Sequence, residues 1–265
     1  MIDSNNVVTV GDLTWPEVQE RLDKGCKIAV LPVGHTEQHG PHLPFSSDTY
    51  FISEATKRGV QLATKESGKP IALVFPTLPY GNGGKYANGE MRLRPSTLIS
   101  IYVDIIRELS LQGFQKTIIA SGHGSNWSSI ADGVNEAHRI GLKQDIFIIS
   151  PWSLINKKIE EIKETKITGH ACEIETSTSL YLFPELVHLE RIQSDEEKEP
   201  YWYLDQSITA VKNETVDNFG GEFKKFTHVS SGYVGNPKKA SKEKGEILIN
   251  TYVREFTNLL LEISK

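Results

Sequence analysis

The chain has 265 residues, of which 38% are hydrophobic, and its 34 acidic and 29 basic side chains give a formal net charge of −5. This length is sufficient for one large α/β domain with a substantial core. The charge balance excludes a strongly basic surface, so we expect neither nucleic acid nor an anionic membrane as a partner.

No apolar run of about 18 residues occurs, and the first ten residues are polar, unlike a membrane span or a signal peptide. We therefore expect a soluble, cytoplasmic protein. Cys26 and Cys172 are the two cysteines, too few for a disulfide framework or a zinc site built from thiolates. A bound metal would need histidine and carboxylate ligands.

Short runs rich in Val and Ile alternate along the chain with longer segments of helical character. A first helix is expected to begin after Thr14, the predicted N-cap. The predicted strands cover residues 27–33, 71–77, 116–121 and 145–150, and the further predicted helices cover residues 48–64, 96–113, 126–141, 172–183 and 238–263. This alternation predicts an α/β fold, a single domain over residues 1–265 with a mainly parallel central sheet flanked by helices.

Two stretches, 79–95 and 188–237, do not follow this pattern. Loops of such length within a compact domain are usually functional lids or contact surfaces. In the first, which is rich in glycine, Lys85 and Tyr86 are candidates for contacts with an oxygen-rich substrate. A solvated surface loop is the alternative for these side chains.

Potential metal ligands follow two of the predicted strands. Glu37, His39 and Asp48 come after the first strand, and His123 follows the third between two glycines. Ligand crevices in open α/β sheets lie outside the carboxyl ends of the strands, so both imidazoles can reach one crevice. A further group, His170, Glu173 and Glu175, precedes and begins a predicted helix.

These residue types predict a binuclear metal site. Imidazole and carboxylate bind Zn²⁺ and Mn²⁺, and two adjacent ions need a carboxylate between them. We expect two divalent ions, Zn²⁺ first, with Mn²⁺ or Fe²⁺ as alternatives, and Asp48 as the bridge. The expected terminal ligands are Glu37, His39, His123 and Glu173. Alternatively, Asp48 is a helix N-cap, and spacing alone does not distinguish the coordinating histidines from His35 and His42.

The same segments resemble the creatininase (creatinine amidohydrolase) family. The matching blocks are Leu31-Pro-Val-Gly, Glu37-Gln-His39-Gly-Pro-His-Leu-Pro with Asp48, Gly122-His123-Gly-Ser-Asn, His170-Ala-Cys-Glu173-Ile-Glu175-Thr-Ser and Pro237-Lys-Lys-Ala-Ser-Lys-Glu-Lys-Gly-Glu246. The resemblance implies a single α/β domain, a homo-oligomer that is often a hexamer, and hydrolysis of a C–N bond in a small, typically cyclic amide. It also implies Glu37, His39, Asp48 and His123 as metal ligands.

The chain departs from creatininases proper at several positions near these blocks. Ser125 stands where they carry a glutamate, so Glu173 is expected to supply the fifth ligand. Gly124 replaces an aromatic residue and Lys166 a tryptophan, which argues against creatinine itself as the substrate. Trp152 resembles the indole that covers the family's substrate, although a core aromatic is the alternative.

The expected reaction is attack on an amide carbonyl by a metal-activated water. His170 is the candidate for carrying a proton to the leaving nitrogen, or else a structural histidine bonded to Glu175. Glu175 is expected to orient a ligand. A formamide or an oxidised cyclitol ring is the alternative substrate. A serine hydrolase using Ser125 lacks the usual nucleophile motif, and a non-catalytic scaffold protein is the alternative from another class.

Overall fold

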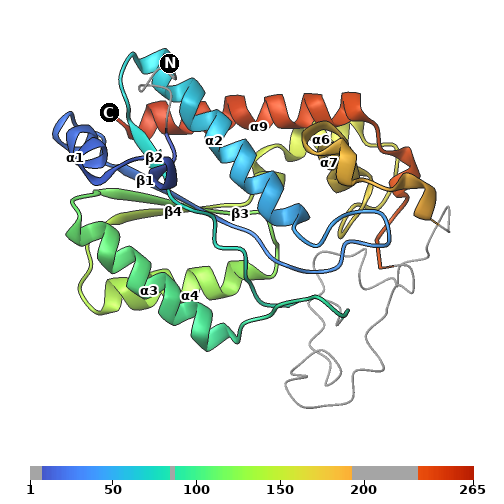
Figure 1. Ribbon diagram of the computed structural model, residues 1–265, viewed down its shortest axis with the longest axis horizontal. Helices are drawn as coiled ribbons and strands as arrows, with labels where there is room; N and C mark the ends of the chain where they lie inside the picture. The colour runs from blue at the N-terminus through green and yellow to red at the C-terminus, as the bar shows by residue number, and fades with distance from the viewer. Residues whose placement is uncertain (1–7, 84–86, 193–231) are drawn as a thin grey trace.

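A computed structural model describes residues 8–83, 87–192 and 232–265. Its centre is a four-stranded parallel sheet in the order β2-β1-β3-β4 (Figure 1). The strands are β1 (Ile28–Val33), β2 (Ala72–Val74), β3 (Lys116–Ser121) and β4 (Asp145–Ile149). All four were predicted from the sequence, although β2 is shorter than expected. The predicted α/β fold with a parallel sheet between helices is confirmed.

Helices cover both faces of the sheet (Figure 1). The pair α2 (Ser47–Ser67) and α9 (Lys242–Ile263) lies on one face, and the pair α3 (Pro95–Leu111) and α4 (Asn126–Arg139) on the other. Successive residues of a strand point to opposite faces. Val30 and Ile118 accordingly join the core under the first pair of helices, and Leu31 and Ile119 join the core under the second.

The remaining helices are shorter. Thr14 caps α1 (Trp15–Asp23) as predicted, and its backbone N–H donates to Glu17 Oε2 at 2.7 Å. The others are α5 (Pro151–Leu154), α6 (Asn156–Ile162), α7 (Glu173–Leu182) and the 3-10 turns Val10–Asp12, Pro184–Leu186, Leu189–Arg191 and Pro237–Lys239. Neither α5 nor α6 is predicted by the sequence pattern, and the last predicted helix starts at Lys242 after one of the 3-10 turns.

Chain topology makes a crevice at one edge of the sheet. From β1 the chain passes through α2 to β2, and it then returns through α3 to β3 on the other side of β1. The connections therefore leave the carboxyl ends of β1 and β3 on opposite faces, which is where ligands bind in open α/β sheets. Gly34 starts the loop after β1, and a Cβ there would lie 2.3 Å from Thr49 Oγ1, so only glycine lets this loop pass so close to α2.

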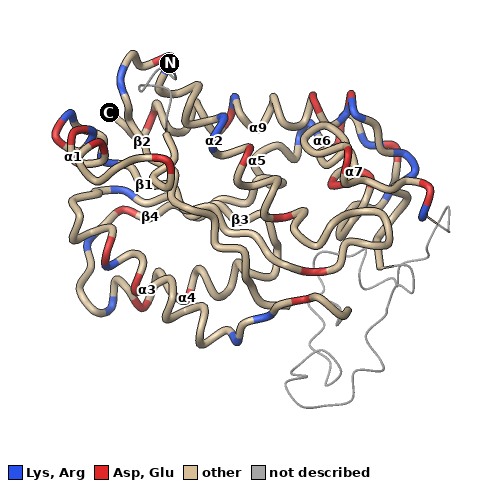
Figure 2. Tube along the Cα trace, in the orientation of Figure 1, with Lys and Arg blue, Asp and Glu red and all other residues tan. Residues whose placement is uncertain are grey.

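Acidic and basic residues are interspersed on α1 and around α6 rather than gathered by sign (Figure 2). Within the described residues, no helix combines the length and the apolar character that crossing a bilayer requires. Lys85, Tyr86 and most of the predicted loop at 188–237 lie outside the described residues.

Candidate metal centre

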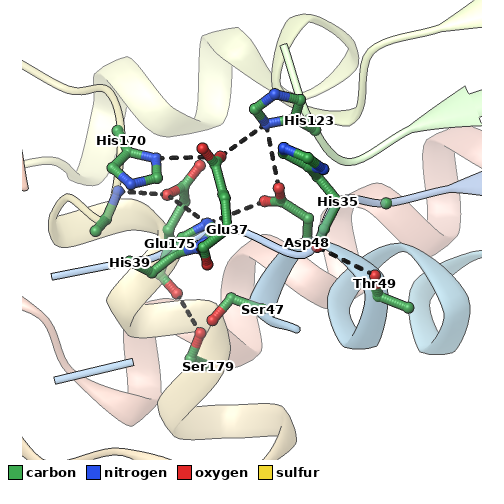
Figure 3. Close-up of polar contacts among 12 residues, drawn as sticks. His35, Glu37, His39, Ser47, Asp48, Thr49, His123, His170, Glu175 and Ser179 are labelled. Atoms are coloured by element: carbon green, nitrogen blue, oxygen red, sulfur yellow. Dashed lines mark hydrogen bonds and ion pairs between the residues drawn. The ribbon is translucent and has the colours of Figure 1, made fainter. Parts of the chain in front are cut away.

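Four of the expected ligands meet at the crevice between β1 and β3 (Figure 3). The loop after β1 carries Glu37 and His39, the first turn of α2 carries Asp48, and the loop after β3 carries His123. None of the four is more than 9% exposed. Segments that are far apart in the sequence therefore bring these four side chains into one buried polar cluster.

Asp48 lies between the two imidazoles of this cluster. Its Oδ1 is 3.1 Å from His39 Nε2, and its Oδ2 is 3.2 Å from His123 Nδ1. His123 Nδ1 is also 2.8 Å from Glu37 Oε1. Each oxygen of one carboxylate thus faces a different histidine, which is the arrangement that a carboxylate bridging two cations requires.

The outer nitrogen of each imidazole is held by a backbone carbonyl. His39 Nδ1 donates to the carbonyl of Glu37 at 3.1 Å, and His123 Nε2 donates to the carbonyl of Asn82 at 2.9 Å. A carbonyl can only accept, so the outer nitrogen carries the proton and a neutral ring turns a lone pair towards the carboxylates.

Two of the inward-facing carboxylate oxygens have no hydrogen-bond partner. Glu37 Oε1 and Asp48 Oδ2 are buried and accept no hydrogen bond from any described residue, although both lie within 3.2 Å of His123 Nδ1. Lone pairs that face one another across such distances repel unless a cation or an additional proton lies between them. The donor set therefore fits divalent metal ions.

Two further side chains complete the cluster. Glu175 Oε2 lies 3.9 Å from His39 Nε2 and accepts the N–H of Ala171 at 2.6 Å. His170 Nε2 donates to the carbonyl of Gln38 at 2.6 Å, and its Nδ1 lies 3.5 Å from Glu37 Oε1. The ligand atoms form three overlapping groups within 4.8 Å, which are His35, Glu37 and His123; Glu37, His39 and His170; and His39, Asp48 and Glu175.

The structure does not bring Glu173 into this cluster. Its carboxylate accepts the backbone N–H groups of Glu164 and Thr165, at 3.0 Å and 2.8 Å, and pairs with Lys244 Nζ at 2.5 Å. Residues two apart on a helix project about 200° from each other, so α7 directs Glu175 and not Glu173 towards the histidines. The structure therefore corrects the expectation that Glu173 supplies the fifth ligand, because Glu175 from the same helix lies beside His39 instead.

His35 and His42, which spacing alone could not exclude as metal ligands, have different surroundings. His35 lies beside the cluster, with its ring 4.6 Å from that of His123, and its Nδ1 accepts the N–H of Gly81 at 3.0 Å. His42 bonds to Thr176 Oγ1 at 2.9 Å. Burial lowers the pKa of both imidazoles to about 4, so both are neutral at pH 7.

Comparison with known proteins identifies the chain's relatives. The family model described as "Creatininase: Creatinine amidohydrolase" matches residues 11–260. The chain belongs to the creatininase family. This confirms the predicted family and the predicted class of metal-dependent hydrolase.

Individual creatininase-family members match over most of their length. The creatinine amidohydrolase of Pseudomonas putida is 28% identical, over 96% of each chain. The 3-dehydro-scyllo-inosose hydrolase of Thermotoga maritima is 29% identical, over 88% of this chain and 76% of that protein. A crystal structure of creatinine amidohydrolase superimposes with a TM-score of 0.79 at 28% identity, over 97% of this chain and 98% of the other.

Electrostatics in this creatininase-family site are dominated by three buried carboxylates. Burial raises the pKa of Glu175 to about 7. Burial also raises the pKa of Glu37, but the charges that His123 and His170 can carry outweigh this and lower it to about 2. Burial lowers the pKa of His39, but the neighbouring carboxylates, first among them Asp48, raise it to about 10. The carboxylates therefore require nearby positive charge, from protons or from metal ions.

A cavity of about 1190 Å³ opens onto the cluster. Glu37, Asp48, His123, His170 and Glu175 line it, together with Ser125, Trp152, Ser153, Asn156 and Lys163. Trp152 also stacks on Phe51, with ring centroids 4.5 Å apart and planes 8° apart. The indole therefore packs on the core and also lines the cavity.

Proposed function

We propose that this creatininase-family hydrolase holds two divalent ions and cleaves a C–N bond in a small, cyclic amide. Glu37 and His123 would bind one ion, His39 and Glu175 the other, and Asp48 both. The observation that carries this proposal is the placement of the Asp48 carboxylate, with Oδ1 facing His39 and Oδ2 facing His123. Inward lone pairs on both imidazoles support it.

The proposed native ion is Zn²⁺, with Mn²⁺ next and Fe²⁺ as a further alternative. Zinc is compatible with imidazole and carboxylate ligands and leaves positions open for water and substrate. Solved creatininases that are 28–29% identical to this chain include a Zn-Zn form and an Mn form. When bound, two such ions lower the pKa of a water and polarise a carbonyl.

His170 is the proposed proton carrier. Its Nε2–H is fixed on the Gln38 carbonyl, which directs Nδ1 towards Glu37 Oε1 and the cavity. An imidazole titrates near neutral pH, so it can accept a proton from the attacking water and deliver it to the leaving nitrogen. Glu175 also fixes the backbone of Ala171, which holds His170 in position.

The substrate is proposed to be a small molecule other than creatinine, bound between the metal centre and Trp152. Lys85 and Tyr86 remain proposed substrate contacts from the glycine-rich loop. An oxidised cyclitol is the second candidate, because Ser125, Ser153 and Asn156 give the cavity a polar wall suited to hydroxyl groups. From the family resemblance we also propose a homo-oligomer, a hexamer by analogy.

Metal analysis combined with hydrolysis assays tests this function. Purified protein, stripped with a chelator and reloaded with Zn²⁺ or Mn²⁺, should hold two ions per chain. It should hydrolyse at least one compound from a panel of cyclic amides, formamides and 3-dehydro-scyllo-inosose, and the chelator should abolish turnover. Fewer than one tightly bound ion per chain would contradict the binuclear enzyme and favour a non-catalytic scaffold. Activity that resists the chelator and is lost in Ser125→Ala would favour a serine hydrolase.

A further inference from the structure

A carbonyl from a distant loop accepts the hydrogen bond of His123 and so determines which ring nitrogen carries the proton. His123 Nε2 donates to the carbonyl of Asn82 at 2.9 Å, while its Nδ1 faces Glu37 and Asp48. If the Asn82 carbonyl moved away, the ring could rotate or change tautomer, and Nδ1 would no longer be held as a lone pair towards the carboxylates. The orientation of this imidazole therefore depends on what holds Asn82 in place.

Asn126 holds Asn82 through its backbone. The Asn126 side chain is fully buried at the start of α4, and its Oδ1 accepts the Asn82 N–H at 3.1 Å. At the other end of the same amide, Nδ2 donates to the carbonyl of Gly34 at 3.0 Å. One amide thus joins the end of β1, the start of α4 and the loop that carries Asn82.

The loop packs on this amide too closely for a larger residue. A Cβ at Gly81 would lie 2.2 Å from Asn126 Oδ1. Gly83 has a φ of +90°, and a Cβ there would lie 2.9 Å from Ser125 Oγ and 3.4 Å from His123 Nε2. Both glycines therefore let the loop backbone approach Asn126 and His123 directly.

We propose that Asn126 is a positioning residue for the metal centre, which fixes the Asn82 carbonyl and so aims His123 Nδ1 at the ion shared with Glu37. This inference rests on the proposed metal centre and deepens it. Within the described residues, Asn126 makes no hydrogen bond to the ligand cluster. Its Oδ1 accepts the Asn82 N–H, and its Nδ2 donates to the Gly34 carbonyl and, at 3.5 Å, to Ser121 Oγ.

The effect should be confined to one of the two ions. His39 is oriented by the carbonyl of Glu37, a contact in which neither Asn126 nor the Asn82 loop takes part. Loss of the Asn126 side chain should therefore weaken the binding of the ion at His123 and leave the binding of the ion at His39 unchanged. A residue that only stabilised the fold would not separate the two ions.

The test is a two-site titration of chelator-stripped full-length protein with Co²⁺, followed by visible absorption and by competition with a chelator of known affinity. In Asn126→Ala one ion should bind about 10- to 100-fold more weakly, and the other should bind within about threefold of wild type. Asn135→Ala is the matched control, because Asn135 is exposed on the same helix α4.

A second variant tests the same contact from the loop side. Gly81→Ala leaves every ligand and Asn126 in place but pushes the loop off the amide, and it serves as the test if Asn126→Ala does not fold. Gly81→Ala should weaken the binding of the same ion. The double variant should bind that ion no more weakly than the more affected of the two single variants, because both changes break the contact between Asn126 and the loop. Unchanged Co²⁺ affinity, or an equal loss of both ions in folded variants, would overturn the inference. Wild-type protein that binds fewer than two Co²⁺ ions would overturn the two-ion centre on which the inference rests.

Discussion

Glu173 and Glu175 lie two residues apart on α7, yet their carboxylates serve opposite sides of the helix. Glu175 Oε2 lies 3.9 Å from His39 Nε2 in the ligand cluster. Glu173 Oε1 lies 2.5 Å from Lys244 Nζ, where it ties the start of α7 to α9. We therefore propose that Glu175 binds an ion and that Glu173 stabilises the packing of α7 against α9.

Substitution of each glutamate by glutamine should separate these roles. Glu175→Gln should lose one ion per chain and most turnover, because an amide is a poorer ligand than a carboxylate. Glu173→Gln should keep both ions but lower the free energy of unfolding by about 1.5–3 kcal/mol, since Lys244 loses a charged partner. Metal content and denaturant unfolding are the measurements. Loss of an ion in Glu173→Gln with Glu175→Gln unaffected would contradict the assignment.

Asp48→Ala should abolish metal retention and turnover together. The carboxylate faces both His39 and His123, so its removal takes a ligand from each proposed ion. Metal content after dialysis and activity in excess Zn²⁺ are the two measurements. Full activity in this variant would refute the bridging role.

His170→Asn should lower kcat by about 10²- to 10⁴-fold, the usual range for a lost acid or base, and should leave two ions per chain. The pH profile of kcat should also lose the limb that reflects the imidazole. His170 lies 3.5 Å from Glu37, so loss of an ion in this variant would show that the imidazole is a ligand rather than a proton carrier.

Metal-free protein should lose stability as pH rises above about 6.5. The pKa of His39 is raised to about 10 from its ordinary 6.5, so its contribution is complete below pH 6.5 and is lost as pH rises through 10. The pKa of Glu175 is raised to about 7 from 4.5, so its contribution is present below pH 4.5 and is lost as pH rises through 7.

Thermal unfolding checks this dependence. In a chelator, Tm should fall steadily as the pH is raised above about 6.5. Zn²⁺ should raise Tm more at about pH 8 than at about pH 6, because metal ions bind the deprotonated ligands and these ligands lose their protons as the pH rises. A Tm in the chelator that does not change with pH would argue against a cluster of coupled histidines and carboxylates.

The sequence alone was sufficient for the sheet and for naming four of the proposed ligands, which the structure brings together. The runs that became β1, β2, β3 and β4 are apolar and separated by helical segments, a local pattern that tertiary packing did not override. Glu37, His39, Asp48 and His123 could be named because they follow strand ends, and parallel strands end at one edge of a sheet.

Only the tertiary structure decided between Glu173 and Glu175, and only it showed what Asn126 holds. Both glutamates belong to one motif, and which of them faces the histidines depends on the rotation of α7 about its axis, which packing against α2 and α9 sets. Asn126 contacts backbone groups 44 and 92 residues away. Nearly every residue type has the same backbone N–H and C=O groups, so the sequence does not indicate which of them Asn126 contacts. Side-chain chemistry and short periodicity are local and can be read from the sequence, whereas helix rotation and contacts between distant segments depend on the folded chain.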